Sequence, residues 1–207
     1  MARKNRGHWL AALVLLAVGA AGGAWLARHA LPALGLDERP PARATDGDIR
    51  TVDFRNFTYA VYCVSEDGRP IEITVRDGEF RRESEHDPLL LNVLSVSYGD
   101  LTGDGAPEAA VATGCNTGGT GQFTEGLVYT MRGGQPVLIG RVEGGDRAFG
   151  GIASLAIERG RLVVERYATD EDGPACCPRY IDTTRLRWEG AELVPEGGAV
   201  RRPAPNE

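Results

Sequence analysis

The chain has 207 residues with 23 basic and 29 acidic side chains, which gives a net charge of −6. Residues 1–30 carry four basic side chains and no acidic one, so the remainder carries −10. A body this acidic, without a basic stripe, argues against nucleic acid as a partner. Lys4 is the only lysine and His86 is the only histidine beyond residue 29. These counts exclude a lysine nucleophile and a multi-histidine metal site from the body of the protein.

Residues 1–30 are predicted to direct the chain to the membrane. Three basic residues precede an uncharged run of 18 residues, 9–26. A signal peptide usually has an apolar core of roughly 7–15 residues, whereas a membrane-spanning helix needs about 20. The observed length lies between the two, so we expect a hydrophobic helix that stays as a single-pass anchor, with a cleaved signal peptide and a secreted protein as the alternative. In either case the positive-inside rule places the body outside the cytoplasm.

Composition divides the rest of the chain into three segments. Residues 31–50 contain Pro32, Pro40 and Pro41 with scattered charges and no period, which is typical of an extended linker. Residues 196–207 are also poor in apolar side chains, and we expect a disordered tail. Residues 51–195 are long enough for one domain with a sizeable core.

Alternation of apolar and polar residues predicts antiparallel strands throughout this domain. Such alternation places one face of a strand on a core and the other in solvent. Four dipeptides separate pairs of alternating runs and predict hairpin turns: Asp77-Gly78, Gly133-Gly134, Arg159-Gly160 and Glu189-Gly190. We therefore expect an all-β domain built from antiparallel hairpins, and a sandwich, an open barrel and a partial propeller all fit the pattern.

One loop has the spacing of a calcium site. Residues 100–108 place oxygen-bearing side chains at positions one, three, five and nine, with Gly105 at the sharp turn and a backbone carbonyl at position seven. Calcium takes about six to eight hard oxygen ligands, and a turning loop can present alternate residues inward. The predicted ligands are Asp100, Thr102, Asp104, Ala106 and Glu108. The alternative is a polar turn in which Asp side chains cap backbone N–H groups.

This segment resembles the calcium loop of FG-GAP and VCBS-type repeats, which follow the pattern strand, D-x-[DN]-x-DG-x-x-[DE], strand. Thr102 departs from the pattern at position three, and the chain has one copy where a propeller needs several. The order of Tyr98–Glu108, Cys115 and Cys176-Cys177-Pro178 also resembles a group of uncharacterised secreted proteins and lipoproteins of high-GC bacteria. The resemblance implies a structural calcium ion and carries no activity.

Four cysteines in an exported chain predict two disulfides. A bond between the adjacent Cys176 and Cys177 would depart from ordinary disulfide geometry. We therefore expect each of them to pair separately with Cys63 or Cys115. The alternative is a redox or metal-binding thiol site.

Two further segments could serve a site. His86, between Glu85 and Asp87, could act as a base, although a solvated surface position is the simpler interpretation. The glycine-rich segment 116–121 lacks the lysine of a phosphate-binding loop. Since it follows the 100–108 loop closely in sequence, it could border a binding surface.

These features favour a non-catalytic envelope module, tethered or secreted, that binds a protein or glycan of the cell envelope. No catalytic residues are assigned. The alternatives are a glycan-directed hydrolase that uses paired carboxylates and a thiol-redox protein that uses Cys176 and Cys177.

Overall fold

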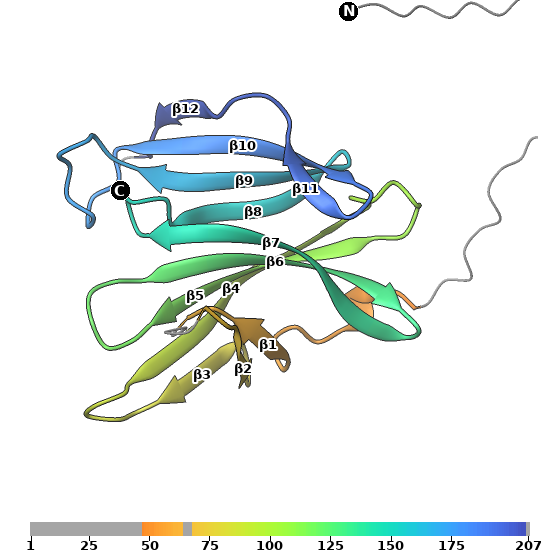
Figure 1. The fold of residues 1–207 in the computed structure, drawn as a ribbon, viewed down its shortest axis with the longest axis horizontal. Helices are drawn as coiled ribbons and strands as arrows, with labels where there is room; N and C mark the ends of the chain where they lie inside the picture. Colours follow the sequence, from red (N-terminus) through yellow and green to blue (C-terminus); the bar gives the residue numbers. More distant parts are fainter. Residues whose placement is uncertain (1–46, 64–67, 206–207) are drawn as a thin grey trace, which may run out of the picture. The chain divides into compact units, whose positions relative to one another are not determined.

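The computed structural model describes residues 47–63 and 68–205 (Figure 1). The predicted anchor at 1–30 and most of the linker at 31–50 lie outside these residues. Within the described part, no helix is both long and apolar enough to cross a membrane. The described residues belong to one compact unit, Pro40–Glu207.

Antiparallel strands make up three sheets of the described chain, as the alternation predicted, and none of them closes into a barrel. A short 3-10 turn, η1 (Ile49–Thr51), precedes a two-stranded hairpin of β1 (Thr58–Val61) and β2 (Ile71–Thr74). The central sheet has the order β3-β4-β5-β6-β7 and consists of β3 (Glu79–Arg82), β4 (Leu89–Gly99), β5 (Glu108–Asn116), β6 (Phe123–Arg132) and β7 (Gln135–Asp146).

The third sheet is a second run of consecutive hairpins. Its strands are β8 (Ile152–Glu158), β9 (Arg161–Ala168), β10 (Tyr180–Glu189), β11 (Glu192–Pro195) and β12 (Val200–Pro203). β11 and β12 share one edge of β10, because β11 pairs with residues 186–189 and β12 with residues 180–183.

Three of the predicted turns have the backbone that their residues suggested. Both central residues have positive φ at Asp77-Gly78 (50° and 85°), Gly133-Gly134 (58° and 76°) and Arg159-Gly160 (50° and 73°). This left-handed pair matches the twist of the flanking strands and therefore closes tight hairpins. Gly133-Gly134 and Arg159-Gly160 join the paired strands β6–β7 and β8–β9, as predicted. Asp77-Gly78 instead joins β2 to β3, which lie in different sheets and meet only through one bridge between Arg76 and Glu79.

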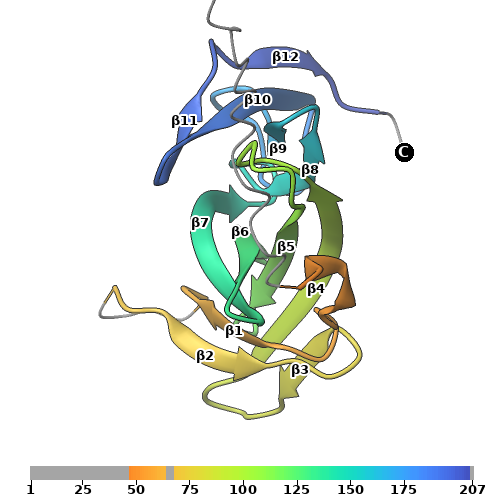
Figure 2. The ribbon, with the colours of Figure 1, turned by 90° about the vertical axis from the view of Figure 1, so that its right-hand side faces the viewer.

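The central sheet is covered on both faces, as Figures 1 and 2 show from two sides. On one face, Val111 and Leu127 pack with η1 and with Tyr59 of the β1–β2 hairpin. On the other, Ala110 and Val128 pack with residues of the β8–β10 sheet. Residues 108–115 of β5 are consequently buried without interruption. The expectation of one solvent face is wrong for this strand, because a second layer covers it.

The domain also extends beyond both predicted boundaries. Ile49, assigned to the linker, is fully buried against the central sheet. Val200–Pro203, assigned to the disordered tail, forms β12. Its exposed side chains carry no apolar pattern, so the strand is held by backbone pairing to β10 and by an ion pair between Arg201 and Asp182 at 2.7 Å. Hydropathy alone gives no sign of such an edge strand.

Candidate functional site

The loop that joins β4 to β5 is held closed by hydrogen bonds between its aspartate side chains and its own backbone N–H groups. The carboxylate of Asp100 accepts hydrogen bonds from the N–H groups of Gly103 (2.7 Å) and Gly105 (3.0 Å), and Asp104 accepts one from Ala106 (2.9 Å). Gly103 and Gly105 have φ of 79° and 86°, a conformation that suits glycine. The two aspartates cap backbone donors, as the alternative interpretation of this loop expected.

Glu108 lies beneath this loop and is fully buried. Its Oε2 accepts the N–H groups of Leu101 (2.9 Å) and Thr102 (3.0 Å), while its Oε1 accepts the hydroxyl of Thr130 on β6 (3.0 Å). Burial raises the pKa of Glu108, and these hydrogen bonds oppose part of that rise. The carboxylate therefore anchors the start of the loop to the central sheet.

The five predicted calcium ligands are consequently divided. Asp100 and Asp104 are exposed, Thr102 and Ala106 are half-buried, and Glu108 has turned into the core. Residues 47–63 and 68–205 contain no group of three or more His, Cys, Asp or Glu side chains placed to hold a metal ion. The complete ligand set does not fit a calcium cage in this arrangement, and calcium binding stays a prediction.

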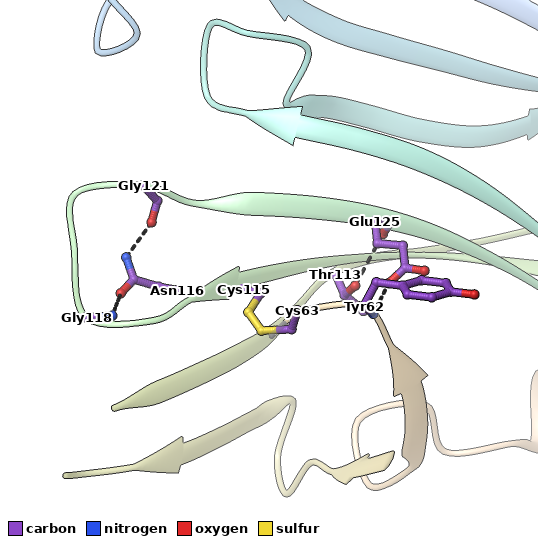
Figure 3. The surroundings of a disulfide bond; sticks show 8 residues. All are labelled: Tyr62, Cys63, Thr113, Cys115, Asn116, Gly118, Gly121 and Glu125. Carbon is purple, nitrogen blue, oxygen red and sulfur yellow. Dashed lines mark hydrogen bonds between the residues drawn. A yellow bond between two sulfur atoms is a disulfide. The ribbon is translucent and has the colours of Figure 1, made fainter. Parts of the chain in front are cut away.

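The end of β5 presents a different environment, shown in Figure 3. Cys115 is bonded to Cys63, which follows β1, with their Cα atoms 5.7 Å apart. The expected pairing of these two cysteines with Cys176 and Cys177 is wrong. The reason is tertiary: the β1–β2 hairpin packs on the face of the central sheet that carries Cys115, and this brings Cys63 to it.

An open groove of about 1370 Å³ lies beside this disulfide. Tyr62 and Phe123 line it and keep 47% and 49% of their surface exposed. Polar groups that face it include Thr113, Glu125 and Arg141. The groove thus offers exposed aromatic surface together with hydrogen-bonding groups, the combination expected of a recognition surface.

Contacts among these side chains hold the groove in shape. Arg141 forms an ion pair with Glu125, donates a hydrogen bond to the carbonyl of Ala60 (2.7 Å) and lies 4.9 Å from the centre of the Tyr62 ring. The N–H of Tyr62 donates to Glu125 (3.2 Å), and the hydroxyl of Thr113 donates to the carbonyl of Glu125 (3.3 Å). Arg141 and Glu125 therefore join the hairpin to the central sheet and position the exposed tyrosine ring.

Two segments identified in the sequence border the groove. His86 and Thr117 are among its lining residues. Asn116 fixes the glycine-rich segment by donating to the carbonyl group of Gly121 (2.6 Å, Figure 3) and to that of Gly119 (3.0 Å). The segment and the 100–108 loop, however, sit at opposite ends of β5, about 27 Å apart for eight residues of strand. The two loops therefore do not share the surface that their proximity in sequence suggested.

Tyr62, Glu125 and Arg141 were not identified in the sequence as site residues. Glu125 and Arg141 lie at similar distances along the sequence on either side of the Gly133-Gly134 turn. A hairpin at this turn therefore brings them near each other. One register shift, between Val128 and Tyr129, displaces the partners by one residue, so that Glu125 lies opposite Glu143. The contact with Tyr62 comes from another layer and has no local signal.

The other two cysteines are bonded to each other. Cys176 and Cys177 form a disulfide between adjacent residues in the 169–179 loop that connects β9 and β10. Both residues are exposed, whereas Cys115 is 4% exposed within the core. The pairing that the sequence argument disfavoured is the one present.

Comparison with protein families, with curated proteins and with solved structures finds no match for this chain.

Proposed function

We propose that this protein is an exported, non-catalytic β module, tethered by residues 1–30 or secreted, which binds an envelope glycan in the groove beside Cys63–Cys115. The observation that carries the proposal is the pairing of two exposed aromatic rings with ordered polar groups in one open groove. Aromatic faces can stack on sugar rings while the polar groups bind hydroxyls. We further propose that the stacked sheets form a sandwich that presents this groove.

The hydrogen-bonding groups favour a glycan over an apolar ligand. Glu125 and Arg141 line the groove with carboxylate and guanidinium groups that keep 14% and 23% of their side-chain surface exposed, and such groups suit a ligand rich in hydroxyls. Arg141 packs against Tyr62, so the ring is held in position before a ligand arrives. A held ring loses less conformational freedom on binding.

A titration of the full chain with soluble envelope glycan fragments tests the proposal. We expect Tyr62→Ala to weaken binding by about ten-fold or more, the effect of losing about 1.4 kcal/mol of contact. Tyr167→Ala, outside the groove lining, is the matched control and should bind like the unaltered protein. Absence of glycan binding, with capture of a protein partner that still depends on Tyr62, would replace the glycan by a protein.

Structural calcium at the 100–108 loop is part of the proposal in a reduced form. Asp100 and Asp104 are exposed, and a site with few protein ligands is expected to be weak, with a millimolar affinity of the extracellular kind. We expect millimolar calcium to raise the melting temperature and Asp100→Asn to abolish that rise. An unchanged melting temperature in calcium and in chelator would remove calcium from the proposal.

A hydrolase is the second candidate, because Glu125 and Glu143 are cross-strand partners and both line the groove. Paired carboxylates can cleave glycosides as acid and base. Under this candidate, glycan fragments shorten on incubation, and Glu143→Gln stops the cleavage without abolishing binding. Intact fragments after prolonged incubation with a binding-competent protein would eliminate it.

A further inference from the structure

The adjacent disulfide Cys176–Cys177 differs from Cys63–Cys115 in its exposure to solvent and in the separation of its two cysteines along the chain. It lies in a surface loop with both residues exposed, whereas Cys115 is buried in the core. Its Cα atoms are 3.8 Å apart, the ordinary spacing of neighbouring residues joined by a trans peptide. The bond closes no loop of chain between distant segments. Exposure thus favours attack by an external thiolate on this bond rather than on Cys63–Cys115.

The loop that carries this bond is coupled to the neighbouring β7–β8 turn. The carbonyl of Ala175, next to Cys176, accepts a hydrogen bond from the N–H of Ala148 (3.1 Å), and Ala148 is 2% exposed. The N–H of Cys177 donates to the carbonyl of Pro174 (3.3 Å). Opening the ring removes its constraint on the peptide between Cys176 and Cys177, directly next to Ala175. The state of the two sulfurs can therefore reach the turn through the hydrogen bond at Ala175.

We propose that Cys176–Cys177 is a redox-active site that exchanges with dithiols outside the cytoplasm, separate from the glycan-binding groove. A thiolate of the dithiol attacks one sulfur of the ring, breaks the S–S bond and forms a mixed disulfide. The second thiol of the reagent then displaces the protein sulfur. The protein gains two electrons and two protons as a pair of thiols, and the dithiol leaves as a cyclic disulfide.

Graded reduction of the oxidised full chain tests this proposal. The protein is equilibrated with increasing dithiothreitol, quenched in acid, alkylated and analysed by peptide mass spectrometry. We expect Cys176 and Cys177 to be alkylated at a dithiol concentration at least ten-fold lower than Cys63 and Cys115. Alkylation of all four together, or of Cys63 and Cys115 first, would overturn the proposal.

Amide hydrogen exchange supplies a second readout at the partially reducing concentration. Exchange at Ala148 is expected to rise several-fold, while exchange in β5 stays unchanged. The double variant C176S/C177S is the matched control, in which dithiol should leave Ala148 exchange unaltered. If Ala148 exchange does not respond in the native protein, the coupling of the sulfurs to the turn is refuted. Glycan binding is measured at the same dithiol concentration. If binding persists while exchange at Ala148 does not respond, the coupling fails and the proposed function stands.

Discussion

The two ends of β5 use polar side chains in opposite ways. At its start, Glu108 is fully buried and takes up the backbone donors of the loop above it. At its end, Cys115 ties the sheet to the β1–β2 hairpin beside an open groove, where Tyr62 and Arg141 remain accessible. The carboxylates of a motif that resembles a calcium loop can thus serve to hold a turn closed. The open groove lies at the other end of the strand, where the β1–β2 hairpin packs on the central sheet.

Replacing the buried carboxylate should have the largest effect on stability. Glu108→Ala leaves the N–H groups of Leu101 and Thr102 without their acceptor, and we expect a loss of about 4 kcal/mol in the free energy of unfolding. Asp104→Ala, which removes an exposed cap, should lose about 1 kcal/mol or less. Urea denaturation of the three proteins measures both. Equal losses would show that the buried end of the loop has no special role.

Removing the disulfide at the other end should have the next largest effect. Cys63→Ala with Cys115→Ala reopens a link across 52 residues, which is expected to lower the free energy of unfolding by about 3 kcal/mol. C176S/C177S should change it by less than about 0.5 kcal/mol, since an adjacent bond barely restricts the unfolded chain. Denaturation midpoints of the two double variants sharpen the comparison. A larger loss in C176S/C177S would contradict the assignment of the stapling role to Cys63–Cys115.

A smaller effect is expected at the partner of Glu108 on β6. Thr130→Val deletes one hydroxyl donor to the carboxylate and should lower the free energy of unfolding by about 1 kcal/mol. It should also raise the pKa of Glu108 further, because a bond to the charged form is lost. Carbon-13 NMR titration of the glutamate carboxyls measures the pKa. An unchanged value would place the hydroxyl outside the network.

Glu108, at the start of β5, and Asp146 should also differ in how pH affects the stability that each contributes. Burial raises the pKa of Glu108 above its ordinary value of 4.5. The contribution of this shift to the free energy of unfolding is therefore full below pH 4.5 and is lost as pH rises through the pKa of the folded state. Asp146, at the end of β7, is opposite: its hydrogen bond with Arg147 lowers its pKa below 3.8, so its contribution is lost as pH falls. Stability relative to Glu108→Gln should therefore decrease with rising pH, and relative to Asp146→Asn increase. Denaturation of the three proteins between pH 3 and 8 measures both slopes, and slopes of the same sign would contradict the prediction.

Local chemistry was sufficient for much of the fold. Gly133-Gly134 and Arg159-Gly160 located two hairpins because positive φ at both central positions depends on the residues themselves. Strand alternation likewise predicted an antiparallel all-β domain. The burial of β5 on both faces was missed, because its small residues, such as Ala110 and Ala112, follow no period of two. Their small volume is what allows two layers to approach the sheet.

The candidate site divides along the same line. Spacing identified the 100–108 loop and its capping aspartates, since those contacts span five residues or fewer. The inward turn of Glu108 depends on Thr130, which is 22 residues away. The groove depends on Tyr62 meeting Glu125 across 63 residues. Neither contact leaves a local signature.

The residue pattern alone therefore indicated the class of fold, several of the hairpin turns and four cysteines able to form disulfides. Tertiary structure alone decided which cysteines bond, which carboxylate is buried and where an open surface remains. The physical reason is range: turn geometry and side-chain alternation act between neighbours, whereas pairing and burial follow from which layers pack together.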